Sequence, residues 1–126
     1  EGSYVASRIL GETAAINYPL IPTIVYGSPK LAETGQTIAN PDAGETEIVM
    51  DLTQWFTYRR VNEDIAKVKL VKNTEGMLIG ASVLSERADD MINYLTFCIQ
   101  QKLTTEDLTK MIMGYPTLAS DLSYLV

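Results

Sequence analysis

Histidine is absent from the sequence. This absence removes the side chain that most often moves protons near neutral pH and that is the commonest transition-metal ligand. The sequence also lacks a Gly-x-Gly-x-x-Gly loop and a Gly-Lys-Ser/Thr phosphate loop, so it offers no nucleotide-binding motif of its own. These absences disfavour an enzyme that completes its chemistry alone.

Cysteine occurs once, at Cys98, so no disulfide can form within the chain. This favours a reducing, cytoplasmic location. Cys98 falls on the apolar stripe of a predicted helix, where a cysteine usually serves as a small packed hydrophobe. We therefore expect a buried thiol and no reactive one.

Basic residues are few: 10 Lys and Arg stand against 16 Asp and Glu, for a net charge of −6. Nucleic acids and anionic membranes are bound by clustered cations, and the one basic cluster here is Arg59-Arg60. No apolar run approaches the roughly 20 residues that span a bilayer. We expect neither nucleic acid nor membrane as a partner.

The first residues have helical spacing, with apolar Val5 and Ile9 followed by Gly11 as a C-terminal stop. The predicted helix begins at Glu1 without a cap or an initiating methionine. It therefore looks as if it continues from something upstream, although a processed or trimmed chain would look the same.

Strands are predicted next. They cover Thr23–Tyr26, Glu47–Leu52, where apolar residues alternate, and a hairpin over residues 66–84 that turns at Asn73–Gly76. Residues 30–44 hold glycine, asparagine and proline and are expected to be mostly turn and loop. Residues 55–58 either extend the second strand or start another sheet edge.

The remainder is predicted to be helical. Apolar residues recur at three- and four-residue steps over 87–101, and Thr104 with Asp107 forms a cap for a second helix that ends at Gly114. After the turn at residues 115–117, a short helix begins at Leu118. Strands followed by helices indicate an α+β domain, an antiparallel sheet flanked by helices.

Charged and aromatic clusters have simple structural interpretations. Glu86, Asp89 and Asp90 suit the first turn of a helix, and Glu63-Asp64 beside Arg59-Arg60 suits a solvated loop with surface ion pairs. No metal site is predicted. The aromatic residues Trp55, Phe56 and Tyr58 either fill the core or form an exposed edge that a partner covers.

Taken in order, several stretches resemble the C-terminal dimerisation domain of the pyridine nucleotide–disulfide oxidoreductases, the family of glutathione reductase, dihydrolipoamide dehydrogenase and mercuric reductase. The resemblance rests on the strand and turn at residues 21–35, the hairpin 66–84, the helices at 88–92 and 103–108, and the closing segment Tyr115-Pro116-Thr117-Leu118. Residues 1–11 resemble the helix that ends the preceding flavin domain.

The resemblance implies a fold of the oxidoreductase dimerisation-domain type over residues 18–126, with residues 1–17 as the terminal helix and connector of a preceding flavin domain. It implies a homodimer attached to upstream flavin and nucleotide domains. FAD and NAD(P)H would belong to the parent protein, an oxidoreductase, and no cofactor to this fragment, which would be inactive alone. The closing segment would enter the partner subunit's active site.

The closing segment departs from the family at two positions. Tyr115 stands where the family has its acid–base His, and Ser120 where it has the orienting Glu; Asp121 comes one residue later, roughly 100° around a helix. Tyr is a poor base but can donate a hydrogen bond. Mercuric reductases resemble the chain in having Tyr there but keep the later carboxylate, so a mercury assignment is not supported.

The resemblance further implies that Tyr115 and Pro116 contact the partner's flavin site and that the bond between them is cis. Three other interpretations stay open. First, the role of Tyr115 could be limited to packing at an interface. Second, the chain could be a free-standing acidic interaction module that binds a protein through its edge around Trp55. Third, it could be a small enzyme built on Tyr and carboxylates.

Overall fold

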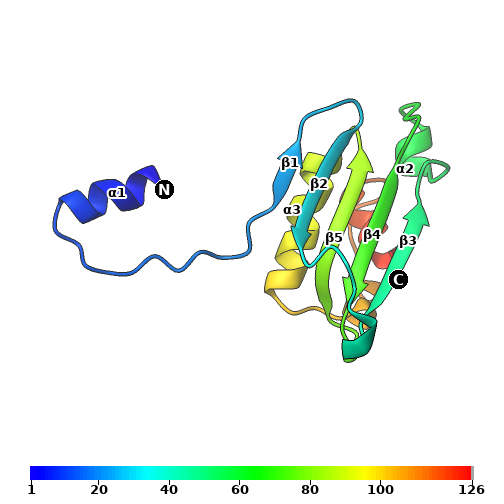
Figure 1. Cartoon of the computed structure of the whole chain (residues 1–126). Helices are drawn as coiled ribbons and strands as arrows, with labels where there is room; N and C mark the ends of the chain where they lie inside the picture. Colours follow the sequence, from blue (N-terminus) through cyan, green and yellow to red (C-terminus); the bar gives the residue numbers. More distant parts are fainter. Residues whose placement is uncertain (126) are drawn as a thin grey trace.

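The computed structural model describes residues 1–125. Its first element is helix α1 (Gly2–Ile9), which ends before Gly11 at a φ of +97°. Figure 1 shows α1 at the far end of an extended connector, away from the sheet. No residue of α1 is buried. The predicted helix and its stop are confirmed, while the assignment of residues 1–17 to a preceding domain stays a prediction.

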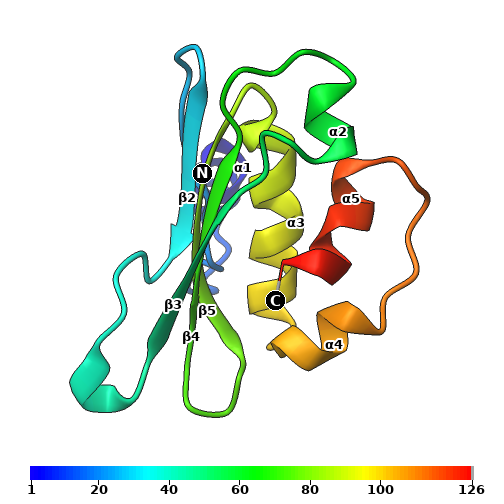
Figure 2. The ribbon, with the colours of Figure 1, turned by 90° about the vertical axis from the view of Figure 1, so that its right-hand side faces the viewer.

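The centre of the fold is a five-stranded sheet in the order β1-β2-β5-β4-β3, with every neighbouring pair antiparallel. The strands are β1 (Thr23–Val25), β2 (Lys30–Gly35), β3 (Thr46–Asp51), β4 (Lys67–Lys72) and β5 (Leu78–Ser85). The predicted strands and the hairpin over 66–84 are confirmed. Figure 2 shows helices on one side of this sheet, so the predicted α+β class is confirmed as well.

Strand β2 corrects the expectation that residues 30–44 are mostly turn and loop. It pairs with β5 along its whole length, from Lys30 opposite Ser85 to Gly35 opposite Gly80. Ala32 and Thr34 alternate inward and are buried. This pairing spans about 50 residues of sequence, so local turn propensity gave no sign of it. Only the stretch after Gly35 is irregular, with a short 3-10 helix η1 (Pro41–Ala43).

Helix α3 (Ala88–Gln100) covers the middle of the sheet and buries its apolar stripe against β2 and β5. It is followed by α4 (Thr105–Thr109), α5 (Leu118–Asp121) and the 3-10 turn η2 (Leu122–Tyr124). Cys98 lies in the core at 2% exposure, and burial raises the pKa of its thiol. The prediction of a packed thiol is confirmed.

Two helical predictions need correction. The helix capped by Thr104 has the predicted capping box with Asp107, but it ends at Thr109 and not at Gly114. Beyond it Ile112, which the prediction placed on the buried face, is 98% exposed. Residues 56–59 are no strand: they form the single-turn helix α2 (Phe56–Arg59), whose inward residues Thr57 and Tyr58 are buried.

Among residues 1–125, every helix is too short or too polar to cross a bilayer.

Candidate functional site

The closing turn runs from Gly114 to Thr117 and contains a cis bond between Tyr115 and Pro116, as predicted. Thr117 holds it: its hydroxyl donates to the carbonyl of Gly114 at 2.6 Å and accepts from the backbone N–H of Ser120 at 3.2 Å. In return the Ser120 hydroxyl accepts from the backbone N–H of Thr117 at 3.1 Å, which completes a capping box at the start of α5. The turn is thereby fixed to its helix.

Ser120 is 5% exposed, and its hydroxyl also donates to the Thr117 carbonyl at 2.7 Å. Its hydrogen-bonding capacity is therefore used within the turn. The role of Ser120 in catalysis remains a prediction, and its geometry describes a helix cap.

Tyr115 lies at the tip of the turn with 67% of its surface exposed. Its ring stacks on Phe56 of α2, with 6.1 Å between the centroids and 22° between the planes. The stacking fixes the direction of the side chain, while the exposure leaves its outer end accessible to another chain. Pro116 is half-buried behind it.

An aromatic groove opens beside Tyr115, with a volume of about 320 Å³. We define it by its lining residues, Trp55, Phe56, Thr57, Tyr115, Asp121 and Tyr124. Trp55 meets Tyr124 edge-on, with 6.2 Å between centroids and 89° between planes. Tyr115 and Tyr124 also line a second hollow on the side of Met111 and Met113. Tyr115 therefore projects between two hollows.

Asp121 lies at the base of the aromatic groove and is 3% exposed. The hydroxyl of Thr57 donates to its Oδ1 at 3.0 Å, whereas its Oδ2 is buried and has no hydrogen-bond partner among residues 1–125. Burial raises the pKa of Asp121, and the Thr57 hydrogen bond and the Arg87 charge oppose that rise. Its Oδ1 is thereby held by Thr57 of α2.

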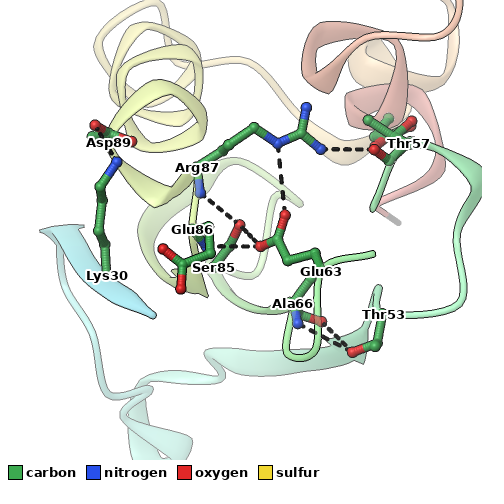
Figure 3. A network of polar contacts seen from close by, with 10 residues as sticks. Lys30, Thr53, Thr57, Glu63, Ala66, Ser85, Glu86, Arg87 and Asp89 are labelled. Carbon is green, nitrogen blue, oxygen red and sulfur yellow. Dashed lines mark hydrogen bonds and ion pairs between the residues drawn. The ribbon is translucent and has the colours of Figure 1, made fainter. Parts of the chain in front are cut away.

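A polar network behind the aromatic groove joins four segments of the chain (Figure 3). Arg87, just before α3, donates from Nη2 to the carbonyl of Thr57 at 2.8 Å, and its Nε lies 3.6 Å from Oε2 of Glu63. The Ser85 hydroxyl and, at 2.7 Å, the backbone N–H of Glu86 donate to the other oxygen of Glu63. The network ties the end of β5, the start of α3 and the loop before β4 to α2.

Glu63 corrects the prediction of a solvated loop with surface ion pairs. Only 2% of its side chain is exposed, and it pairs with Arg87, while the nearby Arg59 and Arg60 are exposed. The loop before β4 folds back over the end of β5, which takes the carboxylate out of water. A buried carboxylate requires a cation and hydrogen bonds, and Arg87 supplies the cation from 24 residues further along the chain.

Tyr58 adjoins this network from α2. The Arg87 guanidinium lies 5.2 Å from the centre of its ring, and its hydroxyl is buried without a hydrogen-bond partner in the described chain. Burial is the main cause that raises the pKa of this hydroxyl. Of the two interpretations of the aromatic residues at 55–58, core filling is therefore correct for Tyr58. Phe56, in contrast, is 46% exposed in the aromatic groove.

The acidic residues at the start of α3 lie where the sequence predicted them, with Asp89 and Asp90 in the first turn. Lys30 of β2 pairs with Asp89 at 2.8 Å and lowers the pKa of that carboxyl. The Ser28 hydroxyl donates to Glu86 at 2.7 Å. Within residues 1–125, no three His, Cys, Asp or Glu side chains gather as a metal-binding group.

The sequence reasoning missed the partnership of Phe56 with Tyr115 and the burial of Asp121 against Thr57. Both contacts join α2 to the closing segment across about 60 residues. The one available signal was the run of aromatic residues at 55–58, which predicted an aromatic edge but not its partner.

Comparison with known proteins supports the resemblance. Residues 21–125 match the sequence profile of the family described as "Pyridine nucleotide-disulphide oxidoreductase, dimerisation domain". The chain is 35% identical to an uncharacterized 19.7 kDa protein in a mercuric resistance operon of Staphylococcus aureus, over 97% of this chain and 71% of that protein. It is 35% identical to dihydrolipoyl dehydrogenase of Bacillus subtilis, over 94% of this chain but 26% of that enzyme.

Solved structures agree on the fold. The flavoprotein disulfide reductase RclA of Escherichia coli superposes with a TM-score of 0.81 and 21% identity, over 95% of this chain and 29% of that chain. LpdA of Mycobacterium tuberculosis gives a TM-score of 0.76 and 21% identity, over 98% of this chain and 28% of that chain. The chain spans about a quarter of the length of the dihydrolipoyl dehydrogenases that it matches.

These findings do not favour a free-standing acidic interaction module. Because the profile of the family matches residues 21–125, and the antiparallel sheet with its helices has the corresponding fold, the chain belongs to the pyridine nucleotide-disulphide oxidoreductase dimerisation-domain family.

Proposed function

We propose that this chain pairs the subunits of an FAD- and NAD(P)H-dependent oxidoreductase and that its closing turn enters the active site of the partner subunit. The observation that carries the proposal is the geometry of Tyr115, which is 67% exposed at the tip of a turn that is closed by a capping box. A side chain that is fixed in direction and open at its end suits insertion into a neighbouring subunit.

The residues of this chain fit a contact with the edge of a flavin site but not the binding of FAD itself. The aromatic groove, at about 320 Å³, is near the lower limit for small-ligand pockets, and no phosphate loop accompanies it. FAD and NAD(P)H would therefore be held by upstream domains of the parent protein, and this chain would contribute Tyr115 and Pro116 to the partner's site. Bound FAD would supply electron transfer between NAD(P)H and the substrate.

Tyr115 serves this site as a hydrogen-bond donor. A tyrosine hydroxyl can donate a hydrogen bond to a thiolate or to a negatively charged oxygen. The hydroxyl of Ser120 is committed to Thr117, so it does not orient Tyr115. Proton acceptance in the reaction would fall to a group on another domain.

The remaining assignments belong to the same proposal. Residues 1–17 would join the dimerisation domain to the flavin domain, since α1 buries none of its residues against the sheet domain. The parent protein would be a homodimer, and the single, buried cysteine favours a reducing, cytoplasmic location for it. Neither nucleic acid nor a membrane would be a partner.

The test uses the full-length protein encoded by the gene that carries this chain. We expect a flavin absorbance spectrum and NAD(P)H oxidation, assayed with a disulfide and, because one relative is a protein of a mercuric resistance operon, with Hg(II). Tyr115→Phe should lower kcat about tenfold, the value of one hydrogen bond of about 1.4 kcal/mol, while flavin reduction by NAD(P)H is unchanged.

The matched control is Tyr26→Phe, because Tyr26 follows β1 and is 72% exposed, close to the exposure of Tyr115. This control should keep the wild-type kcat. A purified protein without flavin would overturn the redox assignment. Equal kcat values for the two variants would remove Tyr115 from the active site.

A further inference from the structure

We propose that Asp121 makes the attachment of helix α5 to α2 sensitive to pH, with α5 bound more firmly when the Asp121 carboxyl is protonated. The inference goes beyond the proposed function, because it concerns contacts within this chain and needs neither a flavin nor a second subunit. It rests on the burial of this carboxyl, on its hydrogen bond to Thr57 and on the charges around it.

Helix α5 is held to the rest of the domain in two ways. Leu118 and Leu122, at its two ends, are buried in the core. Asp121 accepts, at Oδ1, a hydrogen bond of 3.0 Å from the hydroxyl of Thr57 in α2, which joins segments 64 residues apart. The apolar contacts do not change with pH, so a change at Asp121 loosens α5 without releasing it.

The Asp121 carboxylate shares its cation with a second carboxylate. It is 3% exposed, and its Oδ2 has no hydrogen-bond partner among residues 1–125. The charge of Arg87 acts on Asp121, but the same guanidinium is paired with the buried Glu63. With both carboxylates ionised, the cluster holds one excess negative charge out of contact with water. A carboxylate in this position is stabilised by taking up a proton.

In the described chain, the elements around α5 supply no second buried cation. Burial raises the pKa of the Tyr58 hydroxyl on α2 and of the Cys98 thiol on α3, so both groups stay neutral. The other charged or titratable side chains of α2, α3, α4 and η2 are exposed or bonded to other partners: Arg59, Asp89, Asp90, Tyr94, Glu106, Asp107 and Tyr124. The excess charge therefore stays on the cluster itself.

The opening of α5 should increase as pH rises. Burial raises the pKa of Asp121 above its ordinary value of about 3.9, which the carboxyl regains when α5 opens into water. The packed state therefore binds the proton more tightly than the opened state. As pH rises from about 4 through the raised pKa, the opened state becomes relatively more stable, and above that pKa the difference is constant.

The first measurement follows the side-chain carboxyl of Asp121 by carbon-13 NMR while the pH is varied. We expect a titration midpoint above the ordinary value of about 3.9. The midpoint should be higher still in Thr57→Val, because this change removes the hydrogen bond that favours the ionised form. A wild-type midpoint at or below the ordinary value would overturn the proposal.

The second measurement detects the opening of α5 by thiol labelling with 4,4′-dithiodipyridine. Leu122→Cys places a thiol at the buried end of α5, and Cys98 on α3 is the internal reference. Rates are compared with and without Asp121→Asn at each pH, so that ionisation of the thiols cancels. We expect the rate ratio at position 122 to rise about threefold or more from about pH 4.5 to about pH 7.5, and the ratio at Cys98 to change much less.

Asp42→Asn, which removes an exposed carboxylate of η1, is the matched control and should not change the labelling rate at position 122. Circular dichroism confirms that each variant is folded. Where Asp121→Asn unfolds, Thr57→Val takes its place and should enlarge the rise with pH. A ratio at position 122 that does not change with pH would overturn the proposal. An equal rise at position 122 and at Cys98 would also overturn it, because Asp121 would then affect only global unfolding.

Discussion

Replacing Arg87 with methionine removes the central group of the polar network behind the aromatic groove and keeps most of its aliphatic stem. Three contacts disappear: the 2.8 Å hydrogen bond to the carbonyl of Thr57, the guanidinium 5.2 Å from the ring of Tyr58, and the 3.6 Å ion pair with Glu63. The change leaves the Glu63 carboxylate, 2% exposed, without a cation.

The expected loss in the free energy of unfolding is about 3 kcal/mol. Removing one partner of a buried ion pair costs about 3–5 kcal/mol, and a hydrogen bond from a charged donor contributes about 1.5–3 kcal/mol. The lower end applies because the Arg87 side chain is 26% exposed and Glu63 keeps its hydrogen bonds from Ser85 and Glu86. At about 4 °C per kcal/mol for a domain of this size, Tm should fall by about 12 °C.

Urea unfolding of wild type, Arg87→Met, Glu63→Gln and the double variant forms a complete cycle. Glu63→Gln should be destabilising in the wild type but close to neutral, or stabilising, beside Arg87→Met, because the uncompensated charge has then been removed. The coupling should exceed about 1 kcal/mol. Additive effects, or a loss below about 0.5 kcal/mol for Arg87→Met, would refute the assignment of Arg87 as the cation of a buried pair.

Three further outcomes follow from individual residues. Because burial raises the pKa of the Cys98 thiol, a thiol reagent should modify it slowly in the native chain and quickly in urea; fast native modification would contradict its packing. Gly80→Ala would put a methyl group 1.6 Å from the carbonyl oxygen of Gln36 and should cost about 3 kcal/mol in urea unfolding, whereas Gly114→Ala, with no neighbour within 4 Å, should cost much less. The pKa of Asp121 is raised in the folded chain, so its contribution to stability falls as pH rises above its unfolded value of about 3.9. The unfolding free energy of Asp121→Asn relative to wild type should therefore increase as pH rises through that window, and a flat or falling difference would contradict the burial.

The sequence was sufficient for elements whose signal is local. The hairpin over 66–84 has alternating apolar residues around a turn with Gly76 at a φ of +77°, and the stripe on α3 has helical spacing. The cap at Thr104 was recognisable from its spacing to Asp107. These features depend on neighbours within a few residues, so periodicity and capping rules apply directly.

Features set by distant contacts were not predictable in this way. Strand β2 exists because β5 pairs with it, and α2 turns inward because Thr57 and Tyr58 find burial against the closing segment and Arg87. Glu63 looked like a surface residue because its partner lies 24 positions away. The same holds for the candidate site. The family resemblance indicated Tyr115, but its stacking on Phe56 could be identified only from the folded structure.

The proposed insertion of Tyr115 into a second subunit can be tested by cross-linking. The most direct measurement incorporates the photocrosslinker p-benzoylphenylalanine at position 115 of the full-length protein and mixes subunits of light and heavy isotope composition before irradiation. We expect cross-linked peptides that join a light subunit to a heavy one, with the captured peptide in the flavin-binding part of the partner. Cross-links that stay within one subunit, or that are absent while the protein is folded and dimeric, would contradict it.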